Sequence, residues 1–128
     1  MLIGSHVLFY SGNPEADRAF VRDVLKFPYV DVGGGWLIFK LPSAEAAFHP
    51  ADGHTTKAHG GRQLLGAVLY LMCDDLQALI RSLEAKKVQC SPVEEEDWGI
   101  KTTIPLPSGG ELGLYQPKHQ TALDLPSK

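Results

Sequence analysis

The chain has 128 residues, of which 44% are hydrophobic and 21% are charged, and its formal net charge is −3. This profile is typical of one globular domain with a buried core and excludes a disordered chain. The small acidic excess, without a long run of lysine and arginine, excludes the basic surface by which proteins bind nucleic acid. We therefore expect the partner to be a small molecule or another protein.

The hydrophobic segments and the cysteines indicate in which cellular compartment we expect the protein. No apolar run reaches the ~18–20 residues that a membrane helix needs, and the first six residues lack the charged start and apolar core of a signal peptide. These features predict a cytoplasmic protein with no membrane partner. Cys73 and Cys90 form no C-x-x-C motif. We expect buried free thiols, and a disulfide between them stays open as the alternative.

Residues 1–50 are predicted to form a first module of strand, helix and three strands. Ile3–Tyr10 is apolar and alternates in character, which predicts a strand. Asn13 followed by Pro14 predicts the start of a helix that runs to about Lys26. Glycine and proline turns then separate three short apolar segments, which predict strands at Tyr29–Val32, Trp36–Phe39 and Ala44–His49.

Residues 65–117 are predicted to form a second module of the same order. An apolar strand, Gly66–Cys73, precedes two candidate helix caps, Asp74 and Asp75, and an amphipathic helix. Three more strands are expected at 88–93, 99–105 and 111–116, and the acidic run 94–97 is interpreted as a solvated turn. The polar segment 51–64 predicts a flexible linker or flap, and 118–128 a C-terminal tail of the same single domain.

The two modules align with each other at an offset of 62 residues over most of their length and 66 residues at their last strands. An offset of 62 residues places Asn13 on Asp75 and Trp36 on Trp98, and a similar offset places Glu45 on Glu111. Such self-similarity indicates two copies of one βαβββ unit. Each unit offers an open sheet with a helix on its back, so two paired units leave a cup between curved sheets.

The chain resembles the vicinal-oxygen-chelate superfamily, which includes glyoxalase I, bleomycin- and fosfomycin-resistance proteins and extradiol dioxygenases. The resemblance covers about residues 1–117 and is carried by the segments 5–13, 19–27, 70–78 and 107–117. It implies an α+β fold of two βαβββ modules that form a curved mixed-sheet cup with the helices outside. It also implies a homodimer that binds a small organic molecule in the cup. The fold hosts lyases, transferases, dioxygenases and non-catalytic binders, so it leaves the activity open.

Superfamily members that use a metal take ligands from the first and last strand of each module. Among the matching positions of this chain, only His6 offers a ligand. The other three positions fall on Val68, Gly113 and about Ala47. These residues have no side-chain lone pair, and one imidazole cannot hold Zn²⁺, Fe²⁺ or Mn²⁺ against water. The standard metal site is therefore degenerate, and we expect no resident metal cofactor.

Two alternatives remain open beside a metal-free binder. A displaced site of His6, His49 and Glu111 would supply the two histidines and one carboxylate used for non-haem iron. With Fe, Mn, Ni or Zn, that site would make the chain an enzyme of the extradiol-dioxygenase or glyoxalase (lyase or isomerase) kind. The other alternative is an antibiotic-sequestering protein with an aromatic groove and no metal. The sequence does not decide whether the chain is an enzyme.

Strand alternation nominates a set of side chains for the cup. Structural roles compete with this assignment, since a histidine in an apolar strand can pair within the fold and tyrosines can cover sheet edges. The predicted ligand-binding residues are His6, Tyr10, Tyr70, His49, Glu111, Tyr115 and Trp98.

Overall fold

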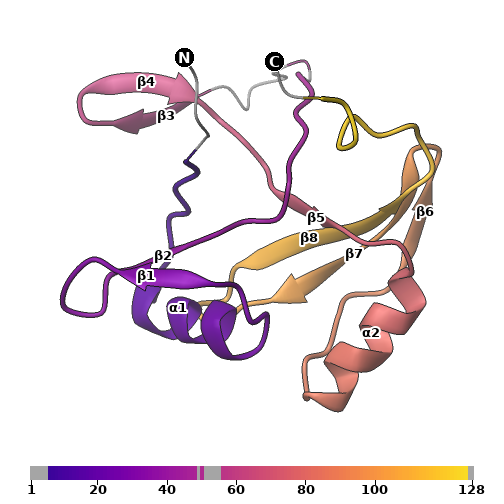
Figure 1. The fold of residues 1–128 in the computed structure, drawn as a ribbon, viewed down its shortest axis with the longest axis horizontal. Helices are drawn as coiled ribbons and strands as arrows, with labels where there is room; N and C mark the ends of the chain where they lie inside the picture. Colours follow the sequence, from indigo (N-terminus) through magenta and orange to yellow (C-terminus); the bar gives the residue numbers. More distant parts are fainter. Residues whose placement is uncertain (1–5, 49, 51–55, 127–128) are drawn as a thin grey trace.

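The computed structural model describes residues 6–48, 50 and 56–126. Over these residues the chain has an α+β architecture in which each of two helices is followed by a run of strands (Figure 1). The elements, in chain order, are α1 (Pro14–Asp23), β1 (Tyr29–Asp31), β2 (Leu37–Phe39), β3 (Thr56–His59), β4 (Arg62–Leu65), β5 (Tyr70–Met72), α2 (Leu76–Ala85), β6 (Glu94–Glu96), β7 (Gly99–Pro105) and β8 (Glu111–Pro117). Within the described ranges, no helix has the length and hydropathy needed to cross a membrane.

The second module forms one four-stranded sheet in the order β5-β8-β7-β6. Strand β5 runs parallel to β8, while β7 is antiparallel to both of its neighbours. The register sets Tyr70 of β5 opposite Gly113 of β8, and Lys101 of β7 opposite Tyr115 of β8. Together with α2, these strands have the predicted βαβββ order, although β5 occupies only the end of the expected strand at 66–73.

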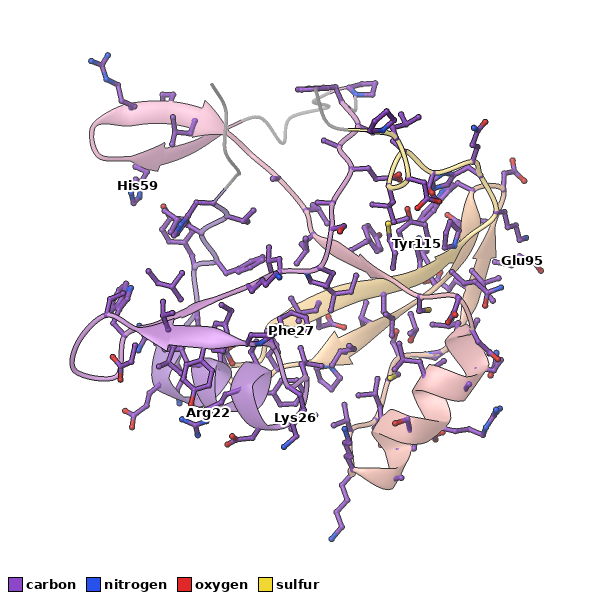
Figure 2. All side chains as sticks on the ribbon, viewed as in Figure 1. Arg22, Lys26, Phe27, His59, Glu95 and Tyr115 are labelled. Atoms are coloured by element: carbon purple, nitrogen blue, oxygen red, sulfur yellow. The ribbon has the colours of Figure 1, made fainter. Side chains whose placement is uncertain are left out.

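The core lies between α2 and one face of this sheet. Leu76 and Leu83 of α2 are buried with Ile104 of β7 and Leu114 of β8. Burying each such side chain stabilises the fold by roughly 1.5–3 kcal/mol before entropy is counted. Because side chains alternate along a strand, the neighbours of Leu114 point to the opposite face. Tyr115 indeed lies on the side of the sheet away from α2 (Figure 2).

Both helices begin where the sequence predicts. The side chain of Asn13 accepts a hydrogen bond from the backbone N–H of Ala16 at 3.2 Å, and Pro14 occupies the first turn of α1. In α2, Asp75 rather than Asp74 is the N-cap, and its side chain accepts from the backbone N–H of Ala78 at 3.1 Å. These local hydrogen bonds satisfy donors that would otherwise have no partner in the first turn.

The first module differs from the prediction at both ends. Strands β1 and β2 form an antiparallel hairpin with Val30 opposite Ile38, but 6–10 and 44–48 form no strand. Alternation describes only how side chains are distributed, whereas a strand needs a neighbour to bond with its backbone. Within the described ranges, those two segments form no ladder with another strand. Residue 49 lies outside the described residues.

The segment predicted to be a linker contains a hairpin instead. Strands β3 and β4 pair antiparallel, with His59 opposite Arg62. Gly60 and Gly61 connect them and both have positive φ, at 58° and 77°. Two such residues suit the tight turn that right-twisted strands require, and backbone pairing does not depend on apolar composition. Residues 51–55 lie outside the described part of the chain.

The acidic run was also assigned wrongly from the sequence. Glu94–Glu96 is β6, paired with Lys101, Ile100 and Gly99 of β7, whereas 88–93, predicted as a strand, is irregular. Charged residues are common on edge strands because they discourage pairing with other chains. The glutamates therefore suit the free edge of the sheet.

Candidate functional site

Three aromatic side chains meet on the sheet face opposite α2. Tyr70 comes from β5, Trp98 from the turn between β6 and β7, and Tyr115 from β8. Their ring centroids are 5.1–5.7 Å apart, and the interplanar angles of 73–85° show edge-to-face contacts. We call these three residues the aromatic wall. Tyr70 and Trp98 are each 37% exposed, so the wall offers ring surface to a ligand.

Gly113 makes room for the wall. A Cβ atom at this position would lie 2.5 Å from Cδ1 of Tyr70 and 3.0 Å from its Cγ. Such distances are shorter than carbon atoms tolerate, so the ring of Tyr70 lies against β8 only because residue 113 has no side chain. This is the position at which the resemblance implies a metal-binding carboxylate. In this chain an aromatic ring fills that space.

A lysine places positive charge beside the wall. The Nζ atom of Lys101 lies 5.5 Å from the ring centroid of Trp98 and 3.4 Å from Oε2 of Glu96. The ammonium group therefore combines a cation–π contact with an ion pair. The wall thus has apolar ring faces and a charged group at one side, a combination typical of sites for small organic molecules.

Tyr115 connects the wall to two residues that the sequence analysis missed. Its hydroxyl lies 3.1 Å from Nε2 of His119, and the two rings stack at 30°. Glu45 lies 3.9 Å from the same nitrogen and also accepts a hydrogen bond from the backbone N–H of Ala122 at 2.7 Å. The C-terminal tail therefore folds back to the segment that precedes residue 49 (Figure 1).

The surroundings of Tyr115 keep it protonated. Burial raises the pKa of the Tyr115 hydroxyl, and the nearby charge of Glu45 raises it further. The side chain is therefore a neutral hydrogen-bonding group throughout the physiological range. His119 gave no sequence signal because it lies in a segment without periodicity. Glu45 was noted only as the counterpart of Glu111.

The other predicted cup residues lie apart from the wall. His6 is exposed, and Tyr10, 58% exposed, places its hydroxyl 2.7 Å from Nδ1 of His59. Glu111 is on the same sheet face as Tyr115 but at the opposite end of β8, where it accepts a hydrogen bond from Thr103. The structure thus brings together Tyr70, Trp98 and Tyr115 of the predicted set, and His49 lies outside the described residues.

The standard metal site of the superfamily does not fit this chain. The ring of Tyr70 occupies the space at Gly113. Val68, which corresponds to His6 in the second module, precedes β5 and is 83% exposed. Among the described residues, no three His, Cys, Asp or Glu side chains are grouped so that they could hold a metal ion. The displaced set of His6, His49 and Glu111 stays a prediction, because His49 is not among those residues.

A shallow, open depression of about 450 Å³ adjoins Trp98. Its remaining lining is charged and comprises Glu95, Glu96, Asp97 and Lys118. The Nζ atom of Lys118 lies 2.5 Å from Oε2 of Glu95. Hydrogen bonding to Lys118, and its positive charge, lower the pKa of the Glu95 carboxyl. This side of the wall is therefore a polar, ion-paired rim.

Both cysteines are free thiols, as expected, and each is partly buried. Burial raises the pKa of the Cys73 thiol, and the charge of Asp74 raises it further. For Cys90, burial and then the charge of Glu84 raise the thiol pKa. Thiols of this kind are poor nucleophiles at neutral pH, which favours a packing role for both.

No family model matches the chain, and no curated protein sequence matches it. Several solved structures are similar to it. The antibiotic-binding protein TnmS3 from Streptomyces sp. CB03234 is similar with a TM-score of 0.59 at 22% identity, over 92% of this chain and 99% of that one. A lactoylglutathione lyase from Agrobacterium tumefaciens has a TM-score of 0.58 at 17% identity, over 89% and 92%.

A glyoxalase/bleomycin-resistance protein, also from Streptomyces sp. CB03234, has a TM-score of 0.52 at 20% identity, over 83% of this chain and 93% of its own. These proteins share one architecture and are matched over nearly their whole length. The chain therefore has the fold of the vicinal-oxygen-chelate superfamily, as the sequence resemblance implies.

Proposed function

We propose that this protein is a cytoplasmic, metal-free binder of a small, partly apolar organic molecule, which it holds against the aromatic wall. The carrying observation is the packing of Tyr70 on Gly113, which substitutes ring surface for the carboxylate of a metal site. Flat aromatic surface with a few polar groups suits such ligands. The hydroxyl of Tyr115 and the ammonium of Lys101 would orient the ligand.

One form of this function is the sequestration of an antibiotic. The neighbour TnmS3 is described as an antibiotic-binding protein, and sequestration needs an aromatic surface but no catalytic group. Identity of 22% shows only a shared fold. The preference for sequestration over lyase chemistry therefore depends on the wall itself.

We further propose that the protein acts as a homodimer. The first module exposes large apolar side chains, among them Phe9 (55%), Val30 (59%) and Trp36 (59%). Exposed apolar surface of this kind marks interaction sites. A second copy would cover these residues and could supply strand partners for 6–10 and 44–48, so that the cup forms between modules.

A ligand screen by thermal shift tests the binding proposal. A library of aromatic organic molecules should contain compounds that raise the melting temperature of the wild-type protein, since a ligand that binds only the folded state stabilises it. The Trp98→Ala variant should lose the shift, while Tyr10→Phe, altered away from the wall, should keep it. A stabiliser that acts equally on both variants would place binding elsewhere.

A further inference from the structure

One nitrogen of His119 faces both of its polar side-chain neighbours. Nε2 lies 3.1 Å from the hydroxyl of Tyr115 and 3.9 Å from Oε2 of Glu45. The other ring nitrogen, Nδ1, lies 2.9 Å from the carbonyl oxygen of Gln120. A carbonyl oxygen only accepts hydrogen bonds, so Nδ1 carries hydrogen whether the ring is neutral or charged. The ring therefore gains or loses its proton at Nε2.

When His119 is neutral, Nε2 presents a lone pair. The Tyr115 hydroxyl then donates its hydrogen to that lone pair, because the carboxylate of Glu45 has no hydrogen to offer. In this state the hydroxyl hydrogen of Tyr115 points toward His119 and is engaged in that hydrogen bond. The free lone pairs of the Tyr115 oxygen can still accept a hydrogen bond from a ligand.

When His119 is protonated, Nε2–H becomes a donor. It can donate to the oxygen of Tyr115, and the charged ring forms an ion pair with Glu45, whose side chain is only 21% exposed. The hydroxyl of Tyr115 must then turn its own hydrogen away from His119. That hydrogen then points away from the ring, and on the proposed binding function an acceptor oxygen of the ligand would approach it at the wall.

The titratable and charged groups around His119 determine which side chains can respond to its charge. Among the residues that the structure describes, the titratable groups that contact His119 are Tyr115 from β8 and Glu45 from the segment before residue 49. Lys118, next to it in the tail, is paired with Glu95 at 2.5 Å, so Glu45 is the carboxylate that faces the ring. Tyr115 and Glu45 approach the same nitrogen. The ring therefore cannot bridge the two groups through its two nitrogens, as the histidine of a Ser-His-Asp triad bridges its serine and aspartate.

We infer that His119 is a positioning residue whose charge sets the direction of the Tyr115 hydroxyl, so that the wall donates a hydrogen bond to ligand oxygen only when His119 is protonated. The inference rests on the proposed binding function and specifies the ligand chemistry. Ligands with a carbonyl or carboxylate acceptor are favoured on the acidic side, and hydroxyl donors on the alkaline side.

NMR of the ligand-free protein tests this inference. The experiment follows the hydroxyl-bearing ring carbon of Tyr115 and the ring nitrogens of His119 between pH 8.5 and pH 5. We expect His119 to carry hydrogen on Nδ1 at pH 8.5. The Tyr115 carbon should then shift with the same midpoint as the protonation of His119.

Two variants test whether the charge of His119 controls the Tyr115 hydroxyl or whether the two side chains are only in structural contact. In His119→Gln, an amide oxygen can accept from Tyr115 at every pH, so the Tyr115 carbon should no longer respond. The matched control is His59→Gln, which removes the other tyrosine–histidine contact, that of Tyr10 at 2.7 Å, and should leave the Tyr115 response unchanged.

An unresponsive Tyr115 in the wild type, or a response that survives in His119→Gln, would overturn the inference. The wild-type titration decides the first point without any variant. Because no ligand is present, failure of this experiment is distinct from failure of the binding proposal, which the ligand screen tests.

Discussion

Residue 113 illustrates how one missing side chain changes the chemistry of a site. The ring of Tyr70 lies where a Cβ atom at this position would be, 2.5 Å from its Cδ1 atom. A carboxylate at residue 113 and the ring of Tyr70 cannot occupy that space together. At this position the chain has an aromatic ring where the resemblance implies a metal ligand.

Gly113→Ala should therefore destabilise the protein. The new methyl group would displace Tyr70, and overpacking of this kind costs about 1–3 kcal/mol. Urea unfolding measures the loss. Gly110→Ala, immediately before β8, is the matched control. A Cβ atom there would lie 3.5 Å from the nearest side-chain atom, which is an ordinary contact. This substitution should change the free energy of unfolding by no more than about 0.5 kcal/mol. Equal effects of the two substitutions would show that Tyr70 does not pack on Gly113.

The buried hydroxyl of Tyr115 predicts a loss of stability in alkali. Burial, and then the charge of Glu45, raise its folded-state pKa above the ordinary value of 10. The stability that the neutral Tyr115 hydroxyl contributes is therefore fully present below about pH 10, and it is lost as pH rises through the folded-state pKa. Urea unfolding at several pH values should show a steeper decline above pH 10 for the wild type than for Tyr115→Phe. Parallel declines would contradict the assignment.

At the scale of elements, capping decides where α2 begins. Asp75, not Asp74, accepts the hydrogen bond from the backbone N–H of Ala78. Asp75→Ala should lower the free energy of unfolding by about 1 kcal/mol. Asp74→Ala, one residue earlier, is the control and should change it by less than about 0.5 kcal/mol. If the two variants are equally stable, the cap is assigned to the wrong residue.

The elements also show what sequence reasoning can reach. Helix starts were predictable because Asn13 and Asp75 act on donors three residues away, within the same element. The hairpin of β3 and β4 and the strand β6 were missed because backbone pairing stabilises them despite their polar composition. The segment 6–10 was assigned as a strand because its side chains alternate, yet it pairs with no strand in the part of the chain that the structure describes.

The residues of the site likewise divide into those that a local pattern predicts and those that only the folded chain brings together. Tyr70 and Tyr115 were predictable because they lie in expected strands, and Trp98 because it corresponds to Trp36 at the repeat offset. His119 was not predictable, since only the folded tail brings it to Tyr115 at 3.1 Å. The packing of Tyr70 on Gly113 depends on the register of β5 against β8, which no local pattern specifies.

At the scale of the whole molecule, the exposed apolar residues of the first module predict self-association. Analytical ultracentrifugation should show a dimer at micromolar concentration. The double variant Val30→Asp and Trp36→Ser should shift it toward monomer, because it places polar atoms in the buried apolar part of the interface. Leu125→Ser, which alters an exposed residue of the tail, should leave the dimer intact. A monomeric wild-type protein would contradict this arrangement.

The central claim is that binding occurs on the aromatic wall without a metal. Its most direct test is a calorimetric titration of the wild-type protein with the best compound from the thermal-shift screen, performed with and without excess EDTA. We predict the same dissociation constant in both conditions, because the space for a metal-binding carboxylate at Gly113 is filled by the ring of Tyr70. Loss of binding in EDTA, restored by Fe, Mn, Ni or Zn, would contradict the claim and favour a metal-dependent site.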